Sequence, residues 1–287
     1  MDASRYYRIR RRVRKTVQYF VMRNIAPLTP HQLRAYRASP RVFANSIPKA
    51  GTNLLSRLLK MMPNVVPAWT YHIDETMDGA FRQLRSGKRG QIITAHMPWT
   101  QKLAEVLEEE QYKKVFIVRD MRDVIVSGLH YVTKKDRSHP LHAYMKSLPD
   151  DDSRLTSLIK GVDAAYYPNQ IKPDSWYNDS YRSFIPWIDD SDCCLLRFED
   201  LIGEQGGGSG GVQAQQISKL AAHLGIDLDR NEVTKISANL FSSSSRTFRK
   251  GQIGDWVYHF SDFHKEIFKE YYGELLIRLG YEEDGNW

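Results

Sequence analysis

The sequence predicts an α/β protein with a single main domain, in which a central parallel β-sheet is flanked by helices. Short apolar runs of strand length alternate with longer segments whose apolar residues recur at helical spacing, as in β-α-β units. Charged and polar side chains follow several of these runs directly, at the strand ends where such sheets bind ligands. The 287 residues are enough for one large core, so we divide the chain into an arm over 1–40 and a domain over 41–287.

The segment Arg41–Met62 predicts a strand, a tight loop and a helix. The strand is the apolar run Val42–Ala44, and the loop resembles a phosphate-binding loop because it aims backbone N–H groups past the strand end. These N–H groups belong to Gly51, Thr52 and Asn53, with the positive end of the helix dipole behind them. Lys49 adds a full positive charge, so we predict a phosphate or sulfate site here.

Two more buried strands are expected at Gln91–Thr94 and Val115–Val118. The first leads to His96 and to a helix over about 101–111, and the second leads to Arg119 and to a helix over about 122–133. Because parallel strands end at the same edge of the sheet, we expect Lys49, His96 and Arg119 to lie on the ligand-binding side.

The second half of the chain predicts one further strand and several helices. We expect the strand over 193–198 and helices over about 155–161, 175–188, 212–224, 231–240 and 261–279. The tract Gly206–Gly211 formally matches the dinucleotide fingerprint G-x-G-x-x-G, but seven residues separate it from the preceding strand. No strand-ending acid follows at the right distance either, so we interpret this tract as a flexible linker.

The net charge of +7 belongs to the N-terminal arm. The stretch Arg5–Lys15 holds seven basic residues and no acid, and without them 34 basic residues balance 34 acidic ones. The neutral body gives no reason to expect a nucleic-acid partner. The arm either forms an amphipathic helix packed on its own domain, or contacts an anionic membrane surface or a polyanion.

The two cysteines, Cys193 and Cys194, are adjacent in the expected strand, where neighbouring side chains point to opposite faces. We therefore expect free thiols, a reducing compartment and a cytoplasmic location. No apolar stretch approaches the 18 or so residues of a membrane span. No spacing of Cys or His predicts a metal site.

Two separate groups of residues predict two anion-binding positions. Arg119 and Ser127 are eight residues apart, at a strand end and in the following helix, so both can reach one anion. Arg249, Lys250 and Gly251 form a second basic spot. A ligand with two phosphate-type groups would satisfy both.

At this point three segments resemble the cytosolic-type sulfotransferases, which use 3'-phosphoadenosine 5'-phosphosulfate (PAPS). Ile47–Leu54 (IPKAGTNL) is similar to the 5'-phosphosulfate loop P-K-S-G-T-T-W, and Val115–Tyr131 is similar to the 3'-phosphate segment R-N-x-x-D-V-x-V-S. Arg249–Trp256 (RKGQIGDW) matches the signature R-K-G-x-x-G-D-W. Weaker similarities lie at Thr94–Pro98 and Phe198–Leu201, and all five segments occur in the family's order.

The resemblance implies a role for each matching residue and no metal ion. Lys49, His96 and Ser127 would be the catalytic residues, with His96 as the general base that takes a proton from the acceptor. The 5'-phosphosulfate would be held by Lys49, Ala50, Gly51, Thr52 and Asn53. The 3'-phosphate would be held by Arg119, Ser127, Arg249, Lys250 and Gly251.

The acceptor and the oligomeric state stay open. The resemblance implies a hydroxyl or an amine on a small molecule or a glycan, in a pocket built from 69–77, 97–99, 131–176 and 241–245. Leu54 and Phe198 stand where the family often has Trp and Tyr, which leaves the adenine contacts undefined. Val257 and Asp262 depart from the family's dimerisation pattern.

The alternative is a P-loop kinase-like phosphotransferase that uses ATP and Mg²⁺. Such a loop reads G-x-x-x-x-G-K-[ST], whereas here Lys49 precedes Gly51 and Ala50 stands in place of the metal-binding Ser or Thr.

Overall fold

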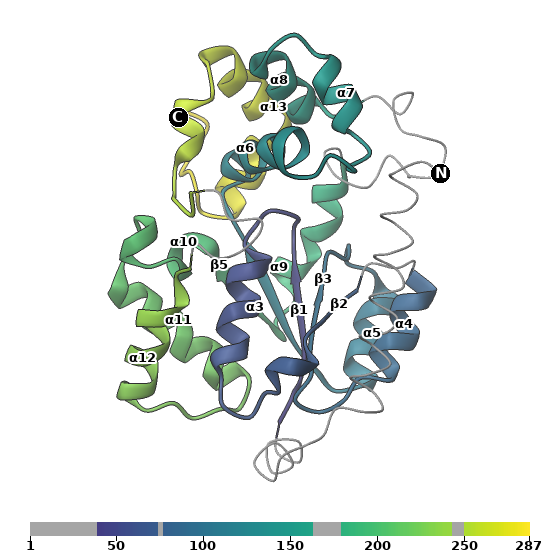
Figure 1. Cartoon of the computed structure of the whole chain (residues 1–287), viewed down its shortest axis with the longest axis vertical. Coiled ribbons are helices and arrows are strands. Elements are labelled where there is room, and N and C mark those ends of the chain that lie inside the picture. The colour runs from purple at the N-terminus through teal and green to yellow at the C-terminus, as the bar shows by residue number, and fades with distance from the viewer. Residues whose placement is uncertain (1–38, 74–76, 163–178, 243–249) are drawn as a thin grey trace.

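A central sheet of five parallel strands organises the protein (Figure 1). The computed structural model describes residues 39–73, 77–162, 179–242 and 250–287. The spatial order of the strands is β2-β3-β1-β4-β5, and all four neighbouring pairs are parallel. The strands are β1 (Arg41–Ser46), β2 (Tyr71–His72), β3 (Ile92–Ala95), β4 (Tyr112–Val118) and β5 (Cys193–Arg197). The structure therefore confirms the predicted α/β class and the parallel sheet.

The helices that follow β1, β3 and β4 lie where the sequence places them. The first half of the chain contains α3 (Thr52–Met61), α4 (Met77–Arg85), α5 (Gln101–Glu109), α6 (Met121–His130), α7 (His142–Ser147) and α8 (Asp151–Lys160). The second half contains α9 (Pro186–Asp189), α10 (Phe198–Leu201), α11 (Gly210–His223), α12 (Arg230–Leu240) and α13 (Asp262–Arg278). Helices α6, α7, α8 and α13 gather beyond the carboxyl ends of the strands (Figure 1).

Shorter helical turns complete the described chain. Four are 3-10 turns: η1 (Pro67–Trp69), η5 (Asp179–Phe184), η6 (Glu204–Gly206) and η7 (Asp255–Tyr258). The fifth, η2 (Tyr131–Lys135), is a π-helical turn that directly extends α6. The sequence did not predict this turn, α4, α7 or β2.

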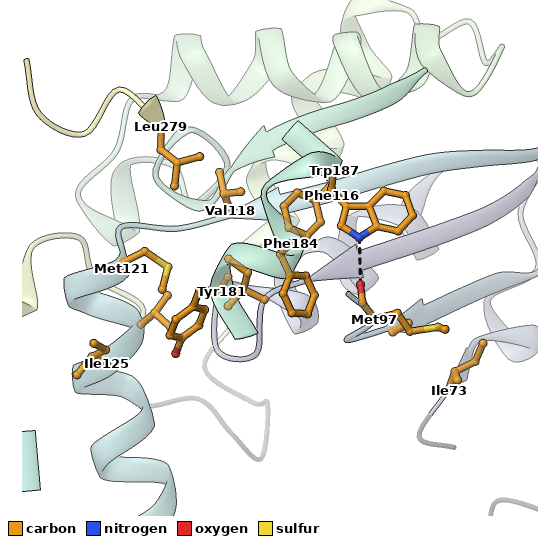
Figure 2. Close-up of a cluster of buried hydrophobic side chains, with 14 of the residues drawn as sticks. Ile73, Met97, Phe116, Val118, Met121, Ile125, Tyr181, Phe184, Trp187 and Leu279 are labelled. Atoms are coloured by element: carbon orange, nitrogen blue, oxygen red, sulfur yellow. Dashed lines mark hydrogen bonds between the residues drawn. The ribbon is translucent and has the colours of Figure 1, made fainter. Parts of the chain in front are cut away.

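The core lies on both faces of the sheet because side chains alternate along each strand. Phe43 and Phe116 point to a cluster that also includes α4, α5, α6, α8 and α13. Their neighbours Val42, Ala44 and Val115 point to a second cluster with α3, α11 and α12. In the first cluster the indole Nε1 of Trp187 donates to the Met97 carbonyl at 3.0 Å (Figure 2). This bond fixes the chain just beyond the end of β3.

Two expectations were wrong. The helix predicted over 175–188 is instead η5 followed by α9, with 175–178 outside the described residues. Pro186, which has no backbone N–H, starts α9 and separates it from η5.

The tract Gly206–Gly211 is not a flexible linker either. The backbone N–H groups of Gly206 and Gly208 both donate to the Gly203 carbonyl, at 3.0 and 2.9 Å, and Ser209 caps α11. The Gly206 carbonyl also accepts from Ile253 N at 3.2 Å. The glycines therefore form a compact turn that packs on the segment around Gly251.

Candidate active site

The loop between β1 and α3 has the backbone of an anion-binding turn. Lys49 and Gly51 both adopt left-handed conformations, with φ of 71° and 112°. A Cβ on Gly51 would lie 2.9 Å from Phe198 Cδ2 and 3.1 Å from Ile117 Cδ1, so only glycine fits there. Left-handed backbone at a non-glycine residue such as Lys49 is strained, and such strain clusters at functional sites.

His96 follows β3 and is tied to this loop by hydrogen bonds. Its Nδ1 lies 2.8 Å from the Ser46 carbonyl, which can only accept, so Nδ1 carries the proton of the neutral ring. The lone pair is therefore on Nε2. Ser46 Oγ lies 3.2 Å from the same Nδ1 and 2.6 Å from Thr52 Oγ1. A continuous chain of contacts thus joins His96 to the first residue of α3.

A second histidine that the sequence did not single out lies beside His96. The ring of His72, in β2, meets the His96 ring edge-on with centroids 5.1 Å apart. Its Nδ1 lies 3.0 Å from Thr94 Oγ1. The sequence gives no signal for His72 because β2 is only two residues long.

The ammonium group of Lys49 reaches the end of α6. Its Nζ lies 4.0 Å from the centroid of the Tyr131 ring, a cation–π distance. Ser127, one turn earlier on α6, is half-buried. The structure therefore brings Lys49 to the helix that carries Ser127.

Residues of the turn after α6 hold Tyr131. Its hydroxyl donates to Asp136 Oδ2 at 2.9 Å, and the ring of His139 meets it edge-on. Burial acts against ionisation of Asp136, but hydrogen bonds from Ser138 and Tyr131 outweigh it and lower the pKa of the carboxyl. Burial lowers the pKa of His139 to about 4, so this imidazole is neutral near pH 7.

Arg119 occupies the end of β4 and is 7% exposed. Its guanidinium stacks 4.3 Å from the ring centroid of Phe198, the same ring that lies against Gly51. One terminal nitrogen donates to Asp123 Oδ2 at 3.2 Å and to the Gln252 carbonyl at 3.0 Å. Its buried Nε has no hydrogen-bond partner among the described residues.

Asp123 connects Arg119 to the segment that follows Arg249. Its Oδ2 accepts from Gly254 N at 3.0 Å, and its Oδ1 accepts from Trp256 N at 2.9 Å. Burial raises the pKa of this fully buried carboxyl, although Arg119 lowers it. Asp123 was not among the predicted site residues, although its place in the pattern R-N-x-x-D-V was a signal that could have identified it.

Lys250 and Gly251 lie close to Arg119 through this connection, while Arg249 lies outside the described residues. Lys250 Nζ is 2.7 Å from Asp255 Oδ1, and half of the lysine side chain is exposed. Gly251 approaches the glycine turn so closely that a Cβ on Gly206 would lie 2.7 Å from its carbonyl oxygen.

Contacts therefore unite the described residues of the predicted site along the carboxyl ends of the strands. His96 reaches the loop through Ser46, Lys49 reaches α6 through Tyr131, and Arg119 reaches Gly51 through Phe198. Ala50 is buried in the loop, and Asn53 is exposed in the first turn of α3.

The geometry fits a ligand with two anionic groups. The left-handed loop offers one position, with Lys49 beside it. The buried Nε of Arg119, which has no partner among the described residues, and the half-exposed Lys250 offer the other. A buried guanidinium N–H without a partner is costly unless a ligand satisfies it, and a phosphate oxygen would do so.

The described residues contain neither a cluster of potential metal ligands nor a helix that could span a membrane. No three or more His, Cys, Asp or Glu side chains within them gather as metal ligands do. None of their helices is both long enough and apolar enough to cross a membrane.

Cys193 and Cys194 are free thiols, as the sequence predicts.

Comparisons with known proteins point in one direction. The family model described as "Sulfotransferase domain" matches residues 39–280. The 3-beta-hydroxysteroid sulfotransferase of Cavia porcellus is 24% identical over 261 residues, which cover 80% of this chain and 81% of that protein. Cytosolic sulfotransferase 1 of Danio rerio is 22% identical over 280 residues, which cover 85% and 86%.

Solved structures share the fold. Mouse sulfotransferase SULT7A1 complexed with PAP superposes with a TM-score of 0.60 at 21% identity, over 87% of this chain and 89% of that one. Retinol dehydratase in complex with androsterone and the inactive cofactor PAP gives a TM-score of 0.52 at 14% identity, over 86% and 85%.

Proposed function

The chain belongs to the sulfotransferase domain family and is a sulfotransferase, and from that premise we propose that it transfers a sulfuryl group from PAPS to a hydroxyl of a small molecule. The observation that carries the proposal is the contact chain from His96 through Ser46 to Thr52. Through these contacts His96, the candidate base, is linked to Thr52 in the candidate phosphosulfate loop, although the two residues are 44 positions apart in the sequence.

His96 would act as the general base. The Ser46 carbonyl holds the Nδ1 proton and so presents Nε2 as the atom that accepts the proton of the acceptor hydroxyl. A neutral imidazole suits this task near pH 7. PAPS, when bound, supplies the sulfuryl group and a nucleotide leaving group with a second phosphate.

Lys49 would stabilise the negative charge that develops on the leaving oxygen. The N–H groups of Gly51, Thr52 and Asn53 at the start of α3 would hold the 5' group together with Lys49. Fixed positive groups of this kind need no rearrangement during the reaction, which is why they are effective.

Arg119, Ser127, Lys250 and Gly251 would bind the 3'-phosphate, with Arg249 as a further candidate from outside the described residues. The unpartnered Nε of Arg119 supports this assignment. Lys250 is held by Asp255 and keeps half of its side chain exposed, so it can also turn to a phosphate.

The relatives favour a small-molecule acceptor. Two of them are named 3-beta- and 3-alpha-hydroxysteroid sulfotransferase, and a hydroxyl on a ring-bearing molecule is therefore the first class to test. An amine or a glycan hydroxyl is the second. The name of the zebrafish relative, with the two free thiols, supports a cytoplasmic location. A kinase-like reaction is not favoured, because the buried Ala50 follows Lys49 where a Mg²⁺-binding hydroxyl is required.

Thermal unfolding with nucleotides tests the proposal before any acceptor is known. We expect 3'-phosphoadenosine 5'-phosphate (PAP) at a hundred times its Kd to stabilise the fold by about 2.7 kcal/mol and raise the Tm clearly. Adenosine 5'-monophosphate, which lacks the 3'-phosphate, is the control and should give a smaller shift. No shift with PAP, or a shift only with ATP and Mg²⁺, would contradict the proposal and favour the kinase-like alternative.

A further inference from the structure

The ammonium group of Lys49 packs against an aromatic ring from a distant part of the chain. A lysine side chain has four rotatable bonds and normally extends into solvent, with many conformations of similar energy. Here Nζ lies 4.0 Å from the centroid of the Tyr131 ring, although the two residues are 82 positions apart in sequence. The ring presents its electron-rich face to the cation at this distance.

The Tyr131 ring is fixed on several sides. Its hydroxyl donates to Asp136 Oδ2 at 2.9 Å, and the backbone N–H of Asp136 donates back to the Tyr131 carbonyl at 2.9 Å. The other carboxylate oxygen of Asp136 accepts from Ser138 N at 3.1 Å and from Ser138 Oγ at 2.6 Å. The ring of His139 meets the Tyr131 ring edge-on, with centroids 6.1 Å apart.

Tyr131 begins the π-helical turn η2, which directly extends α6. Such turns interrupt regular α-helices and occur frequently at functional sites. The turn places Asp136 five residues after Tyr131, within reach of the phenol hydroxyl. Lys134 and Lys135, at the end of this turn, and Arg137, two residues after it, are exposed cations.

We infer that Tyr131 is a positioning residue for Lys49, with Asp136 holding the phenol and the ring face holding the ammonium group. This inference rests on the proposed function of Lys49. The contact keeps the positive charge at the end of α6, one turn beyond Ser127, before any nucleotide arrives. A charge fixed in advance stabilises a leaving group better than one that must first be ordered.

Three variants distinguish the effect of the Tyr131 ring from the effect of its hydroxyl and from the general effect of losing a packed tyrosine. Tyr131→Leu removes the ring, and Tyr131→Phe keeps the ring but loses the bond to Asp136. Tyr144→Leu is the matched control, because Tyr144 is also a half-buried tyrosine that packs on the same core cluster, with a hydroxyl bonded to Ser157.

The first measurement is NMR of the protein with ¹³C-dimethylated lysines, which keep their positive charge. The Lys49 signal is assigned by its loss in Lys49→Arg. A ring under the ammonium group should shift this signal upfield in the wild type, in Tyr131→Phe and in Tyr144→Leu. The shift should disappear in Tyr131→Leu. This readout needs neither turnover nor a known acceptor.

The second measurement is the rate of PAP formation from PAPS, with the probe acceptor 2-naphthol and without any acceptor. Calorimetric titration gives the Kd for PAP of the same variants. We expect Tyr131→Leu to lower kcat about tenfold, the size of one cation–π contact in a partly buried site. The Kd for PAP should change by less than about twofold, because the loop N–H groups and Arg119 remain.

Two results would overturn the positioning role. One is a Lys49 signal that Tyr131→Leu leaves in place. The other is an unchanged kcat with a raised KM for 2-naphthol alone, which would make Tyr131 a contact of the acceptor. A wild-type protein that never converts PAPS to PAP would instead overturn the proposed function, while the NMR signal would still decide the position of Lys49.

Discussion

At the scale of single residues, a hydrogen bond to the backbone decides which ring nitrogen of His96 carries the proton in the neutral form and which has the free lone pair. A histidine at a strand end is commonly structural, and the sequence alone cannot choose its tautomer. The Ser46 carbonyl settles this point, because it forces the proton onto Nδ1. The bond also orients the ring relative to Thr52 through Ser46 Oγ.

The roles proposed for Lys49 and His96 predict different effects of their removal. His96→Ala should lower the rate of sulfuryl transfer by about 10²–10⁴ and leave PAP binding intact, since the imidazole would act only on the acceptor proton. Lys49→Ala should lower the rate to a similar extent and also weaken PAP binding, because it removes a charge from the nucleotide site. Initial rates of PAP formation and calorimetric titration with PAP measure both effects.

His142→Ala is the control for losing an imidazole from the same end of the sheet. His142 is half-buried, and its Nδ1 donates to the Val132 carbonyl at 2.7 Å. If His96→Ala retains more than about a tenth of the wild-type rate, the base assignment is wrong.

Single residues also show how much of the site the sequence could predict. Lys49, His96 and Arg119 follow apolar runs, and the topology of a parallel sheet places strand ends together. Asp123 was missed, and His72 and Tyr131 entered only as members of the ranges expected for the acceptor pocket, because contacts such as those of Asp123 with Gly254 and Trp256 join segments far apart. Periodicity describes local structure and carries no information about such partners.

At the scale of elements, the buried strands were predictable and the glycine tract was not. β1, β3 and β4 are short apolar runs with little alternation, which is the pattern of strands covered on both faces. The tract Gly206–Gly211 has the composition of a linker, yet Gly206 and Gly208 lie where another backbone segment approaches too closely for a Cβ. Composition alone does not distinguish these two reasons for glycine.

This close approach predicts that the glycine turn supports the 3'-phosphate segment. A Cβ in Gly206→Ala would lie 2.7 Å from the Gly251 carbonyl oxygen and 2.1 Å from Ile202 Cγ1, so the backbone around Gly251 must shift. We expect a lower Tm and a Kd for PAP raised about tenfold or more. Thermal unfolding without ligand and calorimetry with PAP at a temperature where the variant is folded measure the two effects.

Gly211→Ala, in the same tract, is the matched control. Gly211 lies in the first turn of α11, and a Cβ there meets only Ser209 Oγ at 3.8 Å. Alanine should stabilise this helix by about 0.5–1 kcal/mol and leave PAP binding unchanged. Wild-type affinity in a folded Gly206→Ala protein would show that the turn does not position the segment.

At the scale of the whole molecule, a network of contacts around the buried Arg122 joins the C-terminal segment to α6. This guanidinium lies over the rings of both Trp256 and Trp287, 4.0 and 4.4 Å from their centroids, and pairs with Asp120 and Glu282. The last residues of the chain therefore pack on the start of α6. The family model matches residues up to 280, so this packing lies partly beyond the matched segment.

The stability of the whole protein should depend on pH through His139, which is 8% exposed. Burial lowers the pKa of His139 from 6.5 to about 4 in the folded state. Between these values the unfolded chain binds the proton and the folded protein does not, so stability rises with pH. The contribution is fully present above about pH 6.5 and is lost as the pH falls towards about 4, and it amounts to about 3 kcal/mol.

His139→Asn should remove this dependence, because asparagine can still accept the hydrogen bond that Leu141 N donates to His139 Nδ1. Urea unfolding at pH 7, 6, 5 and 4 gives the free energy of unfolding of wild type and variant. The difference between the two should shrink as the pH falls. His142→Asn, from the same segment, controls for the loss of an imidazole. If the free energy of unfolding falls with pH in parallel for wild type and His139→Asn, His139 is not the group that titrates. The acid sensitivity would then belong to carboxyl groups such as Asp136, whose pKa is lowered in the folded state.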